Sequence, residues 1–104
     1  MTMLLFFLSG CSDMRPTNFD FKTFERSAKP NSYLICPAHY CAAHIDAIAP
    51  VYPVSVTALM KAWQKMIDAQ PRILVIYHDD HDYQYVQRSL IFRFPDKIYV
   101  RFIP

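Results

Sequence analysis

Two prolines enclose a segment with the period of an amphipathic helix, and this segment restricts the folds open to the chain more than any other. Between Pro53 and Pro71, apolar residues recur three and four positions apart, so they form one stripe on a helix. The stripe consists of Val56, Leu59, Met60, Trp63, Met66 and Ile67. Ser55 is a suitable N-cap and Pro71 cannot continue a helix. We therefore predict a helix from about Ser55 to Gln70 that buries this stripe in a core.

After Pro71 the apolar residues alternate with polar ones, which is typical of strands. We predict a mostly buried strand at 73–78, a polar turn at 78–82, and strands at 83–94 and 97–103 separated by a turn at Pro95-Asp96. In the middle strand the apolar face carries Val86, Leu90, Phe92 and Phe94, and the polar face carries Tyr85, Gln87, Ser89 and Arg93. The predicted fold class is α+β: an antiparallel β-meander with one amphipathic helix packed on one face.

Composition excludes several classes of function. The chain has 104 residues, of which 53% are hydrophobic, so one compact domain is expected. A net charge of +2 gives no nucleic-acid footprint, and the longest apolar run, 3–8, is far shorter than the ~20 residues of a membrane-spanning helix. With a single glycine, the sequence has no Gly-rich phosphate loop and no glycine elbow around Ser89. We find no catalytic constellation and expect neither an enzyme nor a cofactor.

The first eleven residues resemble the lipobox of bacterial lipoproteins, because an apolar stretch ends in two small residues directly before Cys11. The resemblance implies cleavage between Gly10 and Cys11 and attachment of acyl chains such as palmitate to the Cys11 thiol. Ser12 follows the cysteine, which favours the outer membrane. The usual basic n-region is missing, since no Lys or Arg precedes Arg15, and a start codon placed too far downstream would explain this.

This resemblance implies three parts in the chain. Residues 1–10 are a cleaved lipoprotein signal peptide, 11–32 a lipidated tether, and 33–104 the α+β domain. The phenylalanines of the tether, Phe19, Phe21 and Phe24, are expected to dock on the domain. The protein is then lipid-anchored in the bacterial envelope and faces the periplasm, with the membrane as its partner. In the alternative interpretation, residues 3–8 are an ordinary buried strand and Cys11 is a free thiol.

From Pro30 to the C-terminus, the motifs are similar to the bacterial domain-of-unknown-function family 1499. The motifs are Pro30-Asn-Ser-Tyr-Leu-Ile-Cys-Pro37, Gln70-Pro71-Arg72, Gln87-Arg88-Ser89 and Phe92-Arg-Phe-Pro-Asp96. The family supplies no established activity, cofactor or catalytic residue, although its members are often small exported or lipid-anchored proteins. Its pattern continues with a Ser-, Arg- and Gly-containing segment that this chain lacks. The resemblance therefore predicts a domain that is truncated at its C-terminus.

Two cysteines and two histidines lie close together in Cys36-Pro-Ala-His39-Tyr-Cys41-Ala-Ala-His44. In an oxidising compartment, Cys36 and Cys41 are an even pair with a spacing that a disulfide can bridge. The alternatives are free thiols, or a zinc or copper site using Cys36, His39, Cys41 and His44, whose spacings match no standard zinc finger. We favour the disulfide.

Two further groups of polar residues are weaker candidates. The run His78-Asp-Asp-His-Asp82 contains ligands for a divalent cation, but such a run at a hairpin tip is more often a solvated turn. Arg93 and Arg101, interleaved with tyrosines 83, 85 and 99, are expected on the polar face of the sheet, where they would meet an anionic headgroup or a glycan. The simpler expectation is an ordinary solvated face. The sequence thus favours an envelope protein that is a binding or structural module, the alternative being a metal- or redox-active protein centred on Cys36 to His44.

Overall fold

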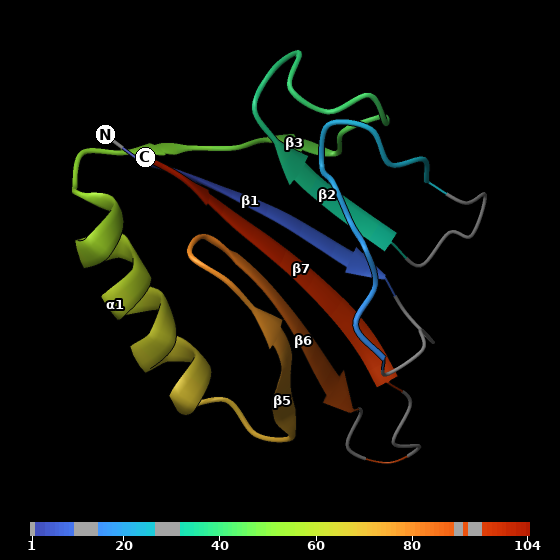
Figure 1. Ribbon diagram of the computed structural model, residues 1–104, viewed down its shortest axis with the longest axis vertical. Coiled ribbons are helices and arrows are strands. Elements are labelled where there is room, and N and C mark those ends of the chain that lie inside the picture. The colour runs from blue at the N-terminus through green and yellow to red at the C-terminus, as the bar shows by residue number, and fades with distance from the viewer. Residues whose placement is uncertain (1, 10–14, 27–31, 89–90, 92–94) are drawn as a thin grey trace.

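The computed structural model, shown in Figure 1, describes residues 2–9, 15–26, 32–88, 91 and 95–104. In chain order its elements are β1 (Thr2–Ser9), β2 (Ser32–Cys36), β3 (Ala47–Ile48), β4 (Val51–Tyr52), α1 (Val56–Asp68), β5 (Ile73–His78), β6 (Asp82–Arg88) and β7 (Pro95–Ile103). One helix on a mixed, mostly antiparallel sheet confirms the predicted α+β class. Among the described residues, no helix is long and apolar enough to cross a membrane.

The strands form one sheet in the order β3-β2-β1-β7-β6-β5, with β4 pairing the start of β1. The predicted antiparallel meander is present as β5, β6 and β7. Strand β7 continues the sheet by pairing antiparallel with β1, from Met3 opposite Ile103 to Ser9 opposite Lys97. Because β2 and β3 run parallel, the sheet is mixed. The first and last strands of the sequence therefore lie side by side in the middle of the sheet.

The apolar run at the N-terminus forms this central strand. In β1, Leu5 is fully buried and Phe7 is only 7% exposed, and the strand is flanked by β2 and β7. An uninterrupted apolar run suits a strand that is covered on both faces. Whereas the lipobox implies a domain that starts at Tyr33, residues 2–9 and 15–26 pack into the same cores as the rest of the chain. Cys11 lies outside the described residues.

Helix α1 covers one face of the sheet, which we call the helix face. The side chain of Ser55 caps the helix by accepting a hydrogen bond from the Ala58 N–H (3.1 Å), as predicted. The predicted stripe packs on β1, β6 and β7, with Trp63 donating from Nε1 to the hydroxyl of Tyr85 (2.8 Å). The prediction was wrong for Met66, which is 40% exposed, because it lies at the margin of the stripe.

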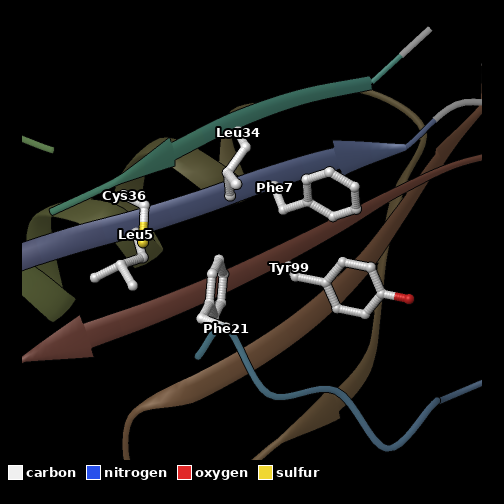
Figure 2. Packing of buried hydrophobic residues seen from close by; sticks show 6 residues of the cluster. All are labelled: Leu5, Phe7, Phe21, Leu34, Cys36 and Tyr99. Atoms are coloured by element: carbon white, nitrogen blue, oxygen red, sulfur yellow. The ribbon is translucent and has the colours of Figure 1, made fainter. Parts of the chain in front are cut away.

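The opposite face is covered by chain without regular structure. We call residues 15–26 the strap and this side of the sheet the strap face. Figure 1 shows the strap crossing β1, and Figure 2 shows Phe21 of the strap between Leu5 and Tyr99, in the same cluster. Phe19 and Phe24 pack on the same cluster, which confirms the expectation that the phenylalanines dock. The loop after β2 completes the cover through Tyr40, Cys41, Ala43 and Ile45.

Because both faces are covered, the predicted division into apolar and polar faces was wrong for β6. Tyr85, assigned to the polar face, is fully buried against the helix, and Val86, assigned to the helix side, is buried on the strap face. The predicted turn at Pro95-Asp96 is instead the start of β7, where a strand tolerates proline. Strand β6 ends at Arg88, and residues 89–90 and 92–94 lie outside the described residues.

Strand β5 is correctly predicted as a strand, but the expectation that it is mostly buried was wrong. It is the edge strand of the described sheet, and its side chains are intermediate or exposed, with Leu74 55% and Tyr77 41% exposed. A strand with a neighbour on one side only cannot bury its apolar side chains as a central strand does.

Candidate functional site

The side chains of β7 that point to the strap face bind the strap instead of facing water. Lys97 is 2% exposed and donates from Nζ to the main-chain oxygen of Arg15. The hydroxyl of Tyr99 hydrogen-bonds the Thr17 hydroxyl (2.8 Å), and its ring stacks on Phe19 with centroids 3.9 Å apart. Burial raises the pKa of Tyr99. The expectation of a solvated polar face is therefore wrong for Lys97 and Tyr99.

The side chain of Gln84 in β6 binds the main chain of the strap. Its Nε2 donates to the Thr17 carbonyl (2.7 Å), and its Oε1 accepts from the Thr17 N–H (3.0 Å). The buried side-chain amide thus satisfies both main-chain groups of one strap residue, as a neighbouring strand would. This attachment depends on the backbone of the strap and not on its side chains.

Arg101 is the centre of the charged contacts on this face. Its Nε and Nη2 donate to the two carboxylate oxygens of Asp82 (2.7 and 3.2 Å), and its Nη1 donates to Asp20 of the strap and to the Tyr40 hydroxyl (both 3.2 Å). The hydrogen bond to Asp82 is the main reason why the pKa of Arg101 is raised. Four of the hydrogen bonds that a guanidinium can donate are thus made within the protein.

Of the predicted ligand face with Arg93 and Arg101, the structure describes Arg101 alone. Arg101 is neutralised by two carboxylates, so it does not offer its charge to an anionic headgroup. Tyr83 and Tyr85 pack in the helix-side cluster, on the other side of the sheet from Tyr99. Arg93 lies outside the described residues.

An open groove of about 570 Å³ lies between the strap and the end of the β5–β6 hairpin. The strap side is formed by residues 16–21, and the sheet side includes Tyr77, Asp79, Asp82, Gln84, Tyr99 and Arg101. Phe19, Tyr77 and Tyr99 supply aromatic surface, and three carboxylates line the groove with one guanidinium. Two negative charges are therefore in excess, which makes the groove more suitable for a cation than for an anion.

Asp79 is held in a fixed position at the rim of this groove. The Tyr77 hydroxyl donates to one of its oxygens (2.9 Å), and the main-chain N–H groups of His81 and Asp82 donate to the other (3.1 and 2.9 Å). Partial burial favours the neutral acid, but the hydrogen bonds from Asp82, Tyr77 and His81 outweigh it and lower the pKa of Asp79. The hydrogen bond to Asp79 in turn raises the pKa of Tyr77. The carboxylate is thus ionised at neutral pH.

The run from His78 to Asp82 is the predicted polar turn, closed by the Asp79 N–H donating to the Asp82 carbonyl (2.9 Å). No group of three or more His, Cys, Asp or Glu in the described ranges is placed to hold a metal ion.

Cys36 and Cys41 form the predicted disulfide, with their Cα atoms 6.4 Å apart. Cys36 is fully buried in the strap-side core, while His39 and His44 are exposed. The bond leaves neither sulfur as a thiolate, so the alternative metal site loses two of its four ligands. The disulfide also fixes Tyr40, whose hydroxyl contacts Arg101, and the adjacent Ala42 N–H donates to the Lys22 carbonyl of the strap (3.1 Å).

Sequence reasoning missed Asp20, Gln84 and Tyr77 as residues of the groove. The sequence does contain a signal for Asp20, because it lies between Phe19 and Phe21. If both phenylalanines dock on the sheet, the carboxylate between them must lie close to the sheet as well. Gln84 and Tyr77 carry no signal of this kind, because their role depends on a strap distant in sequence from their strands.

Comparison of the chain with protein-family models, with curated proteins and with solved structures finds no match. The similarity to family 1499 therefore stays a hypothesis that depends on the motifs alone.

Proposed function

We propose that this protein is a binding module of the bacterial cell envelope and that the groove beside the strap takes a small organic cation. The observation that carries the proposal is the groove itself, in which carboxylates and aromatic rings converge and the single guanidinium is already paired. Carboxylates attract an ammonium group, and aromatic faces add cation–π attraction. Asp79 is the main recognition group, because its hydrogen bonds position it before a ligand arrives.

The disulfide supports the location. Cytosolic thiols are kept reduced, whereas disulfides persist in the periplasm and outside the cell. A bridge between Cys36 and Cys41 is thus expected in a protein that is exported.

Lipid attachment at Cys11 is a second candidate feature, and the Leu8-Ser9-Gly10-Cys11 sequence favours it. Cleavage before Cys11 would remove β1 from the centre of the sheet. A lipidated chain therefore lacks residues 2–9, whereas the intact sheet contains them. The intact mass of the protein from the membrane fraction distinguishes them. A chain that starts at an acylated Cys11 supports the lipoprotein, and an unmodified chain that retains residues 2–9 contradicts it.

Binding is tested with two probes that share a ring and differ in charge, tyramine and para-hydroxyphenylacetate, using titration calorimetry on the full chain. We expect tyramine to bind and the carboxylate not to bind. Asp79→Asn should weaken tyramine at least about tenfold, and Asp68→Asn, an exposed change on α1, should not. Equal affinity for both probes, or no heat of binding at millimolar tyramine, would overturn the cation site and leave a structural module.

A further inference from the structure

A second pocket opens on the helix face, on the other side of the sheet from the groove. It has a volume of about 250 Å³ and is lined by Leu4, Phe6, Ile35, Pro50, Tyr52 and Trp63. These residues come from β1, β2, β4, α1 and the turn before β4. We propose that this pocket binds the hydrocarbon part of a small amphiphile.

The lining offers almost no polar partner. The side chains of Leu4, Phe6 and Ile35 are hydrocarbon, and the indole N–H of Trp63 is already donated to Tyr85, so the Tyr52 hydroxyl is the one polar side-chain group left in the lining. A polar group that entered would lose most of its hydrogen bonds to water without replacement, which costs on the order of several kcal/mol. An alkyl or aryl group loses nothing and gains about 25 cal/mol for each Å² of apolar surface that it buries. The part of the ligand inside the pocket is therefore a hydrocarbon.

The pocket is large enough for such a group and remains open to solvent. An apolar cavity of roughly 150 Å³ already accommodates benzene, so a pocket of about 250 Å³ has room for a short alkyl chain. An opening to water requires the other end of the ligand to be polar. The fit is thus to an amphiphile with one short tail.

The cause of the pocket is the incomplete cover of β1 on this side. Leu4 and Phe6 are only half-buried, although Leu5 between them is fully buried on the strap face. Helix α1 packs on β1, β6 and β7, and Trp63 is its contribution to the pocket wall. The apolar surface that the helix leaves open is the surface that the ligand covers.

The chain has a single tryptophan, and it lines this pocket, so its fluorescence reports on the site directly. Bromo-octanoate, used below its micelle concentration with the full chain, brings a bromine quencher on an alkyl tail. We expect saturable quenching of Trp63. Leu4→Phe, which fills the pocket, should weaken it at least about tenfold, whereas Leu74→Phe on the exposed edge strand should leave it unchanged.

Circular dichroism establishes that each variant is folded, and Ile35→Phe replaces Leu4→Phe if the latter unfolds. Quenching that increases linearly, as for free N-acetyltryptophanamide, would overturn the proposal, and so would saturable quenching that neither filling substitution weakens. A dimer that forms through this surface and excludes the probe would also overturn it, which sedimentation of the probe-free chain detects. Tyramine binding in the groove is independent of these outcomes, because the two sites lie on opposite faces.

Discussion

The two faces of the sheet are covered by different kinds of chain, and over β1 the irregular cover is the more complete one. The 13-residue helix buries one of its own residues fully, Ile67, and leaves Leu4 and Phe6 of β1 half-buried. The strap has no helix or strand, yet beneath it Leu5 is fully buried, and its own Phe21 is 2% exposed. Large aromatic side chains and hydrogen bonds to the strap backbone achieve this burial. Regular secondary structure is thus not what decides how well a face is covered.

The largest expected effect on stability comes from removing β1, the central strand that the helix covers on one face and the strap on the other. A chain that begins at Cys11 lacks β1, which pairs with both β2 and β7. We expect this chain to show no cooperative thermal unfolding by circular dichroism, because the sheet is divided and both cores lose their centre. The full chain measured in the same buffer is the control. A cooperative transition near that of the full chain would contradict the role of β1 and support cleavage of residues 1–10.

The next effect compares one apolar side chain from each cover. Phe21→Ala should lower the free energy of unfolding by about 3–5 kcal/mol, the range for a fully buried aromatic residue. Leu59→Ala, in the half-buried stripe of α1, should lower it by about 1–2 kcal/mol. Urea denaturation of both variants measures the difference. Equal losses would mean that the helix and the strap contribute similarly.

The disulfide supports the strap cover and not the helix. Closing a loop as short as that between Cys36 and Cys41 contributes about 2 kcal/mol on the chain-entropy model. The double variant Cys36→Ala with Cys41→Ala should therefore unfold at a lower urea concentration, and reduction of the native chain should do the same. A thiol titration of the unreduced chain without lipid should find one thiol, that of Cys11. Three reactive thiols would exclude the bridge.

A smaller loss is expected when the amide that holds the strap backbone is removed. Gln84→Leu leaves the N–H and the carbonyl of Thr17 without their partner. Thr17 is exposed, so water replaces part of what is lost and the cost is about 1 kcal/mol. Tyr85→Phe removes the matching polar contact on the helix face, to Trp63. Tyramine affinity should decrease for Gln84→Leu alone, and a decrease for both variants would show that the two faces are coupled.

The smallest expected effect is a decrease in stability at acidic pH, which arises from an ion pair of the strap. The N–H of Leu34 and the guanidinium of Arg26 donate to Asp46 (2.8 and 2.9 Å), and they lower its pKa. Because the unfolded chain then binds the proton more readily, the contribution to stability is present above the ordinary carboxyl pKa and is lost as the pH falls through the lowered pKa. Asp46→Asn should make the urea midpoint less dependent on pH below about 5. An unchanged dependence would contradict this role.

The sequence was sufficient to predict the helix and the meander, because each is recognised from the spacing of apolar residues within one short segment. It was not sufficient to show that the polar face of β7 is covered, because Lys97 and Arg101 alternate with apolar residues as they would on a solvated strand. Here the polar side chains bind the main chain and a carboxylate of the strap, a contact between segments about 80 residues apart. The run 3–8 was equally ambiguous, since an apolar segment suits both a signal peptide and a central strand. Contacts between residues distant in sequence decide whether such a segment is buried, and the spacing of apolar residues gives no information about those contacts.

The pairing of β1 with β7 also determines when the protein can fold. Met3 lies opposite Ile103, so the sheet cannot close until residue 103 has left the ribosome. Contacts between residues so far apart in sequence slow folding, because the chain must first close a long loop. The topology therefore delays folding until synthesis has passed residue 103.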